Sequence, residues 1–205
     1  MNPSFCLRIA FVVSLTALLS APAAATASVE QRDSLARVGQ RAEFLAAEAA
    51  LKGGQVSTFR GLKRSLEGYP LLPYLEYEEL RSHLARTSNA QVEAFLTRYP
   101  DSPLAYRLRN NWLDRLAERK RWQDYLHFYR PATGVTRRCL HLRALIETGR
   151  PQEAFAEVPQ LWLYGKSQPK ECDPVFAAWR DAGKLTPDLV WQRIALAMQA
   201  RETRL

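Results

Sequence analysis

Three glutamates on one short segment are the first residues to weigh for catalysis, because two carboxylates across a cleft can cleave a glycosidic bond. Glu76, Glu78 and Glu79 all fall within one predicted helix. Adjacent positions such as 78 and 79 point to different faces of a helix, so these two carboxylates do not form such a pair. This spacing is typical of a solvated helix face, and we predict no general acid or base here.

Nucleophilic catalysis needs a serine or cysteine held near a histidine and a carboxylate. Cys139 and His141 are close in sequence, but positions i and i+2 of a helix do not face each other, and the chain has no Gly-x-Ser-x-Gly turn. The scattered glycines form no phosphate-binding loop. The residues alone therefore predict no catalytic group and no cofactor, and they disfavour most nucleotide-dependent enzymes.

Aromatic residues offer a second kind of chemistry, which is stacking on sugars. Trp162 and Tyr164 lie beside Gly165 and Lys166, where a predicted helix enters a loop. Aromatic faces pack well on the apolar faces of sugars, so Trp162, Tyr164 and Lys166 are the candidate glycan contacts. The alternative is core filling between packed helices, which is also the role we expect for most of the five tryptophans. These are Trp112, Trp122, Trp162, Trp179 and Trp191.

Residues 1–27 have the three parts of a secretory signal peptide. Arg8 supplies a positive charge, residues 9–19 form an apolar run, and alternating alanines offer cleavage sites, with cutting expected after Ala25 or Ala27. The apolar run is shorter than the roughly 20 residues that span a membrane. We therefore predict an exported protein with no transmembrane anchor after cleavage. An uncleaved anchor helix is the alternative.

The net charge indicates an anionic partner. The chain carries +8, and removal of residues 1–27 leaves 28 basic and 21 acidic residues, or +7. A basic chain commonly indicates nucleic acid, but export removes that partner, so no nucleic acid is expected. Phospholipid headgroups, lipopolysaccharide and the carboxylates of cell-wall peptides remain. The alternative, which composition alone favours, is a solvated basic surface with no specific partner.

Export also changes the meaning of the three cysteines. Cys6 leaves with the signal peptide, so the mature chain holds only Cys139 and Cys172. In an oxidising compartment an even count favours a disulfide, and closing a loop of this length contributes about 3–4 kcal/mol in the chain-entropy model. Two buried free thiols are the alternative. No metal site is expected, because the three histidines are not at ligand spacing with both cysteines.

The mature chain has the apolar spacing of helices, which predicts an all-α fold of nine or ten short helices after one longer helix over residues 28–52. A capping residue before proline marks three helix starts, at Ser102-Pro103, Asp173-Pro174 and Thr186-Pro187. The faces that we expect to be buried include Leu104, Leu108, Trp112 and Leu116, and also Val190, Ile194, Ala195 and Met198.

Short helices joined by tight turns stack as hairpins. Residues 88–130 and 132–165 are each expected to hold a pair, with a weak period of about 35 to 40 residues. This pattern favours a superhelical solenoid of short antiparallel helix pairs, of the tetratricopeptide-like kind, in which each pair packs on its neighbours. An irregular helical bundle is the alternative. Residues 28–205 would then form a single domain.

A specific resemblance begins at Trp162. Residues 162–179 contain Gly-Lys-Ser-Gln-Pro followed by Cys-Asp, and residues 69–77 read Tyr-Pro-Leu-Leu-Pro-Tyr-Leu-Glu-Tyr. With supporting stretches such as Arg193-Ile194, the chain resembles the N-terminal helical domain of the periplasmic soluble lytic murein transglycosylases over about residues 40–205.

The resemblance implies a U-shaped superhelix, a periplasmic location and peptidoglycan as a partner. It also implies that Cys139 and Cys172 form the disulfide of the family. The family activity is non-hydrolytic cleavage of the β-1,4 bond between N-acetylmuramic acid and N-acetylglucosamine to a 1,6-anhydro product. One glutamate of a lysozyme-like domain serves there as acid and then as base.

The chain departs from the family at its catalytic motifs. No glutamate is followed by serine, and Gly-Leu-Met-Gln is absent, so no catalytic residue is carried over. We therefore expect residues 28–205 to be a U-type domain truncated at its C-terminal end. It would be a scaffold that binds peptidoglycan and contacts the missing linker and catalytic domains. The alternatives are an exported helical-repeat adaptor that binds another protein, and an enzyme without a recognisable motif.

Overall fold

The computed structural model describes the backbone of residues 23–131 and 133–201, with side chains from residue 34 onward. Within these ranges the regular elements are ten α-helices and one short 3-10 helix, which confirms the predicted all-α class. Cys6 and the apolar run of the predicted signal peptide lie outside the described residues. None of the described helices is long and apolar enough to cross a membrane. The chain divides after Leu66 into two compact units.

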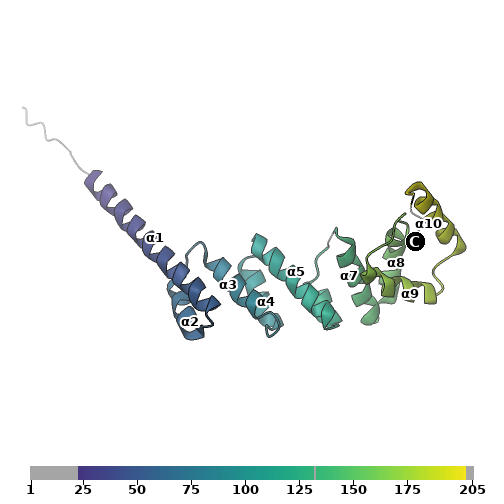
Figure 1. The fold of residues 1–205 in the computed structure, drawn as a ribbon, viewed down its shortest axis with the longest axis horizontal. Helices are drawn as coiled ribbons and strands as arrows, with labels where there is room; N and C mark the ends of the chain where they lie inside the picture. The colour runs from purple at the N-terminus through teal and green to yellow at the C-terminus, as the bar shows by residue number, and fades with distance from the viewer. Residues whose placement is uncertain (1–22, 132, 202–205) are drawn as a thin grey trace, which may run out of the picture. The chain divides into compact units, whose positions relative to one another are not determined.

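The first unit is a hairpin of two helices, α1 (Ala23–Lys52) and α2 (Val56–Ser65). α1 is the long N-terminal helix that the sequence predicts, and α2 lies beside its C-terminal part (Figure 1). The turn between them uses Gly54 at φ +69°, a backbone conformation that glycine adopts without strain. Small residues of α1 allow α2 to approach closely. The buried side chains of this hairpin are Ala47, Ala50, Phe59 and Leu66.

The second unit is a row of helices in which each packs against the next along the chain as far as α9 (Figure 1). Contacts limited to near neighbours in sequence are typical of a helical solenoid. The helices are α3 (Leu72–Ser82), α4 (Asn89–Arg98), α5 (Pro103–Glu118), α6 (Trp122–Phe128), α7 (Val135–Glu147), α8 (Pro151–Trp162), the 3-10 helix η1 (Lys170–Cys172), α9 (Asp173–Asp181) and α10 (Pro187–Gln199).

The helix pair predicted in residues 132–165 is present as α7 and α8. The prediction of a single pair in residues 88–130 is wrong. Three helices, α4, α5 and α6, occupy that region. α6 is only 7 residues long. It begins two residues after Lys120, which has a positive φ of 55° and so turns the chain sharply. So short a helix contributes too few apolar repeats to be separated from α5 by periodicity.

Two of the three predicted helix caps are confirmed. The Ser102 hydroxyl accepts a hydrogen bond from the Leu104 backbone N–H (3.2 Å), and the Thr186 hydroxyl accepts one from the Leu189 backbone N–H (3.3 Å). A helix also starts at the third site, but the predicted cap is wrong, because Asp173 is the first residue of α9. The 3-10 helix before it runs directly into α9 and leaves no extended residue to serve as a cap.

Two apolar clusters form the core of the second unit. The first surrounds α5, whose predicted stripe is buried along its whole length, and the Trp112 ring meets the Phe128 ring edge-on at 6.3 Å between centroids. The second surrounds the cysteine pair and includes Leu142, Leu145, Ala154, Val158, Leu161, Val175 and Trp179. Arg137 of α7 ties the two regions together through an ion pair with Asp114 of α5 at 2.8 Å.

The prediction of which face of α10 is buried is wrong. Ile194 and Ala195 are exposed, and the Met198 side chain is 74% exposed, whereas Ala197 is buried. Trp191 on the same helix is 69% exposed and does not fill the core as the sequence led us to expect. α10 instead turns its Arg193 and Ala197 side toward the rest of the unit, because the loop after α8 meets it there.

Candidate functional site

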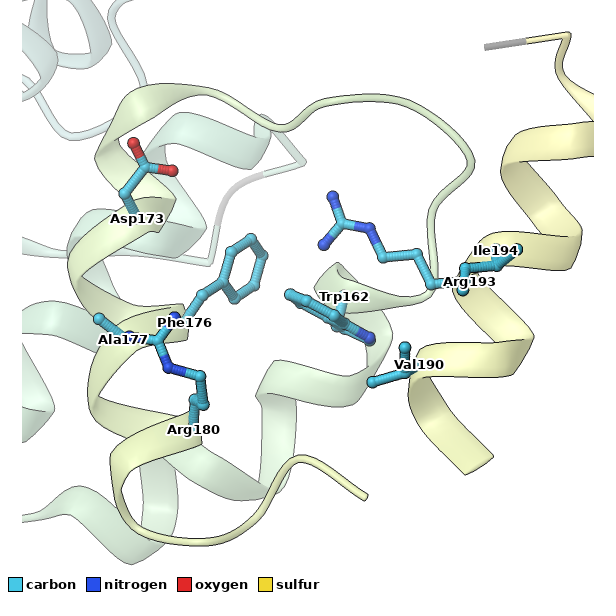
Figure 2. Close-up of a pocket in the computed structure, with 8 residues that line it drawn as sticks. All are labelled: Trp162, Asp173, Phe176, Ala177, Arg180, Val190, Arg193 and Ile194. Atoms are coloured by element: carbon cyan, nitrogen blue, oxygen red, sulfur yellow. The ribbon is translucent and has the colours of Figure 1, made fainter. Parts of the chain in front are cut away.

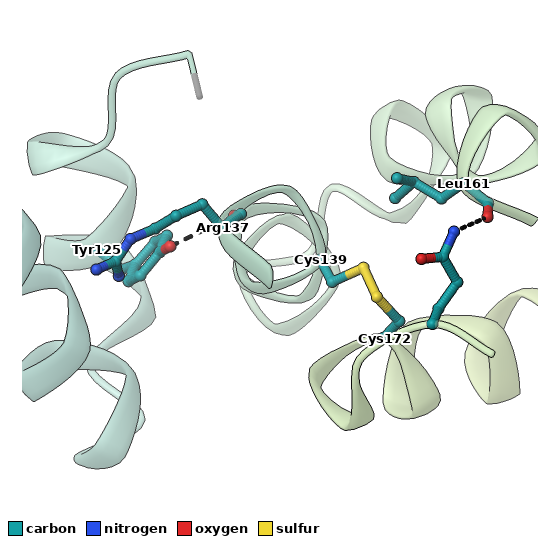
Figure 3. Close-up of a disulfide and its surroundings, with 6 residues drawn as sticks. Tyr125, Arg137, Cys139, Leu161 and Cys172 are labelled. Carbon is teal, nitrogen blue, oxygen red and sulfur yellow. Dashed lines mark hydrogen bonds between the residues drawn. A yellow bond between two sulfur atoms is a disulfide. The ribbon is translucent and has the colours of Figure 1, made fainter. Parts of the chain in front are cut away.

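The cysteine pair anchors the region that contains the candidate site. Cys139 in the middle of α7 and Cys172 at the end of η1 form a disulfide, with their α-carbons 4.9 Å apart (Figure 3). Both residues are fully buried. The bond fixes the start of α9 against α7, and it thereby limits the paths open to the loop between α8 and η1.

A hydrogen bond holds the same loop from its other side. The Gln168 side-chain amide donates to the backbone carbonyl of Leu161, 2.7 Å away, near the end of α8. This bond satisfies one of the carbonyl groups that the last turn of a helix leaves without an intrahelical partner. Figure 3 shows this hydrogen bond to Leu161 beside the Cys139–Cys172 disulfide. The loop is therefore fastened at both ends, which gives Trp162 a fixed place.

Trp162, one of the predicted glycan contacts, ends α8 and is half-buried. Its indole N–H donates to the backbone carbonyl of Leu189 in α10, at 3.2 Å. Its ring meets Phe176 of α9 edge-on, with centroids 5.3 Å apart, and also touches Trp179. Trp162 thus connects three helices, and this packing accounts for its position without a ligand.

Arg193 of α10 lies over the outer face of that indole. Its guanidinium carbon is 4.1 Å from the Trp162 ring centroid and 5.8 Å from that of Phe176, which is the geometry of a cation–π contact (Figure 2). The buried Nε of Arg193 has no hydrogen-bond partner among the described residues. Burial lowers the pKa of this guanidinium, because leaving water disfavours the charged form.

These side chains form one wall of an open pocket of about 530 Å³ between α8, α9 and α10 (Figure 2). This volume lies in the usual range of small-molecule sites. Most of the lining is apolar, and its charged members are Asp173, Arg180 and Arg193. The lining residues are Trp162, Asp173, Phe176, Ala177, Arg180, Val190, Arg193 and Ile194.

The other two predicted glycan contacts do not line this pocket. Tyr164 is 50% exposed and Lys166 is exposed, both on the loop that follows α8. The structure therefore separates the three candidates, with Trp162 facing the pocket and the other two facing solvent. The sequence reasoning missed Phe176 and Arg193. The available signal was Gly165, since a glycine beside an aromatic residue indicates a close approach of another segment.

The glutamates of residues 76–79 and His141, which were considered in the sequence, do not line the pocket. Glu78 forms an ion pair with Arg81 at 2.7 Å, and Glu76 forms one with Arg98 at 3.1 Å. The Glu78 side chain is 42% exposed and fits the predicted solvated face, whereas the prediction is wrong for Glu76, whose side chain is only 17% exposed beside Arg98. The His141 ring stacks on the Tyr129 ring, with centroids 4.0 Å apart. Among the described residues no group of three possible metal ligands is found.

Comparison with known proteins places this fold. The soluble lytic murein transglycosylase of Escherichia coli K12 is 35% identical over 179 residues, which cover 87% of this chain and 27% of that protein. The enzyme of the same name from Salmonella typhimurium is 34% identical over 167 residues. This chain is a relative of the soluble lytic murein transglycosylases. It spans about a quarter of the length of these relatives and matches their N-terminal helical domain.

Solved structures of soluble lytic transglycosylases agree with this relationship. The 70 kDa soluble lytic transglycosylase of Escherichia coli superposes with a TM-score of 0.69 at 34% identity, covering 79% of this chain and 26% of that one. The same enzyme in complex with bulgecin A gives the same match. An inactive mutant of lytic transglycosylase Slt from Pseudomonas aeruginosa gives a TM-score of 0.67 at 38% identity, covering 78% and 26%.

A second kind of match concerns the C-terminal part of the chain. The sequence profile of the Cucumovirus coat protein family matches residues 149–205. This span is less than half of the chain, whereas the transglycosylase relatives align over most of it. We therefore do not assign the chain to the coat protein family from this match.

Proposed function

We propose that this chain is the non-catalytic helical portion of a soluble lytic murein transglycosylase. The alignment with the Escherichia coli enzyme, 35% identical over 87% of the chain, carries this proposal. The activity of the whole enzyme would be cleavage of the bond between N-acetylmuramic acid and N-acetylglucosamine with formation of 1,6-anhydro products. The chain has no Glu-Ser and no Gly-Leu-Met-Gln sequence to perform it.

The state of the acidic residues supports a scaffold role. Glycosidases need one carboxyl group with a raised pKa facing a second carboxylate. Glu76 and Glu78 pair with arginines on helix surfaces, and Asp173 is the only acid that lines the described pocket. We expect the full chain to release no anhydro-muropeptides from purified murein. Clear release of such products by the full chain would overturn the scaffold proposal.

Export to the periplasm is the second part of the proposal. We expect residues 1–27 to be removed as a signal peptide, with cutting after Ala25 or Ala27. The Cys139–Cys172 disulfide supports this compartment, because such bonds persist in oxidising environments. N-terminal sequencing of the chain recovered from a periplasmic fraction tests it. An uncleaved chain retained in the cytoplasm would contradict it.

Contact with the cell wall is the third part. The mature charge of +7 would attract the acidic peptide stems of murein by long-range electrostatics. Exposed charges are screened by salt, so binding should weaken as ionic strength rises. Cosedimentation of the full chain with purified sacculi at increasing salt measures this directly. Binding that is absent or insensitive to salt would contradict the proposal, and retention of a protein without murein would favour the adaptor.

A further inference from the structure

The pocket between α8, α9 and α10 contains an arginine whose hydrogen-bonding capacity is unused. The Arg193 guanidinium lies over the Trp162 ring, and no hydrogen bond or ion pair to it is formed by any residue that the structure describes. A guanidinium presents five N–H donors in a rigid fork, and donors that no protein group accepts from are available to a ligand. Figure 2 shows these nitrogens reaching past the indole toward Phe176 and the open pocket.

The charges in the lining match a ligand with one negative charge. The lining contains two cations, Arg180 and Arg193, and one anion, Asp173. Arg180 already contacts Asp181, a residue outside the lining, at 3.3 Å. Arg193 has no such partner and is therefore the cation best placed to bind a ligand, while the single net positive charge of the lining favours a singly charged anion over a doubly charged one such as phosphate. A planar carboxylate fits the fork of a guanidinium through two parallel hydrogen bonds.

The remaining lining is apolar and partly aromatic. Trp162 of α8, Phe176 of α9, and Val190 and Ile194 of α10 all contribute to it. A pocket of about 530 Å³ has room for a group the size of an amino-acid side chain beside the carboxylate. A purely hydrophilic anion would leave these surfaces in contact with water and gain nothing from them.

We propose that this pocket binds a small organic monocarboxylate, with the carboxylate on Arg193 and an apolar or aromatic group against the apolar lining. The same chemistry occurs in a free acid and at the C-terminal end of a peptide. The pocket is a site of the helical chain itself, and its ligand binding does not depend on the proposed enzymatic context.

Calorimetric titration of the full chain with N-acetylphenylalanine, and with N-acetylphenylalanine amide as the neutral match, tests the proposal. We expect the acid to bind about ten- to a hundredfold more tightly than the amide, which is the range of one charge-assisted pair. Equal binding of the two probes, or equal displacement of the acid by inorganic phosphate, would overturn it. A tripeptide ending in phenylalanine distinguishes the two sources, since a peptide-end site binds it as well as the acid and a free-acid site does not.

Three variants assign the effect to Arg193. Arg193→Gln should remove the preference for the acid, and Arg193→Lys should retain part of it, because lysine keeps the charge and loses the fork. Arg107→Gln, which changes an exposed arginine of α5, should leave the preference unchanged. The indole N–H signal of Trp162, assigned with Trp162→Phe, should shift on addition of the acid and not of the amide. Retained preference for the acid in a folded Arg193→Gln variant would overturn the proposal.

Discussion

The backbone at Gly165 lies directly against the carbonyl group of Leu196 in α10. A Cβ atom placed on Gly165 would overlap the carbonyl oxygen and lie 2.8 Å from the carbonyl carbon. Main chain cannot move aside as the end of a flexible side chain can. This close approach therefore requires glycine, and it holds α10 in the orientation that brings Arg193 over Trp162.

Replacement of this glycine should loosen α10. We expect Gly165→Ala to lower the free energy of unfolding by about 1–3 kcal/mol, the usual cost of forcing extra atoms into a packed contact. Gly61→Ala is the matched control, because a Cβ there meets no atom within 4 Å. Since Gly61 lies inside α2, that change should raise stability by about 0.5–1 kcal/mol. Urea denaturation measures both, and equal effects of the two changes would contradict the role of the Leu196 contact.

The disulfide should account for a large share of the stability of the second unit. Its two cysteines are 33 residues apart in sequence, and closing such a loop contributes about 3–4 kcal/mol in the chain-entropy model. We expect the Cys139→Ser, Cys172→Ser double variant to lower the urea midpoint accordingly. A reducing agent should shift the unmodified chain in the same direction and leave the double variant unchanged. A shift of the double variant by the reducing agent would show that another process is involved.

Burial of His141 predicts a dependence of stability on pH. Burial lowers the pKa of this imidazole below its usual value of 6.5. The negative charge of Glu157 acts in the opposite direction and raises the pKa, but burial is the larger effect. The unfolded chain then takes up the proton more readily than the folded one. The stabilisation is complete above about pH 6.5 and declines as the pH falls from there toward the folded-state pKa. His141→Phe, which preserves stacking on Tyr129, should flatten the unfolding free energy between pH 7 and pH 5. An unchanged slope would contradict this assignment.

The sequence predicted the elements whose structure depends on local chemistry. Ser102 and Thr186 cap helices because a hydroxyl before a proline has a backbone N–H within reach. The stripe from Leu104 to Leu116 is buried because α5 is long and amphipathic, so its apolar face is unambiguous. Asp173 has the same local pattern, but the 3-10 helix before it changes the backbone and removes the cap. Tertiary context decided that case.

The pocket could not be predicted because its parts come from three helices. Trp162 was recognised from its neighbours in sequence, whereas Arg193 lies on another helix and belongs to a residue type that is usually solvated. The face of α10 was assigned from Val190 and Ile194 by periodicity alone. The periodicity of one helix holds no information about its contacts with other segments. The contact between Gly165 and the carbonyl of Leu196, which sets the rotation of α10, could therefore not be predicted from it.

Glycan contact by the loop after α8 is the remaining prediction, and it depends on the proposed function. Tyr164 and Lys166 project from a loop that is fixed by the disulfide and by the Gln168 amide. Because a loop held at both ends loses little entropy on binding, an exposed aromatic ring there can stack on a sugar. We expect Tyr164→Ala to weaken cosedimentation with sacculi about two- to tenfold.

Two controls separate stacking from general charge. Tyr74→Ala removes a tyrosine with 52% exposure from α3, against 50% for Tyr164, and should leave binding to sacculi unchanged. Lys166→Ala should weaken binding at low salt and have little effect at high salt, because an exposed charge is screened there. If Tyr164→Ala and Tyr74→Ala have equal effects, the loop has no special contact, and attraction by the net charge alone accounts for binding.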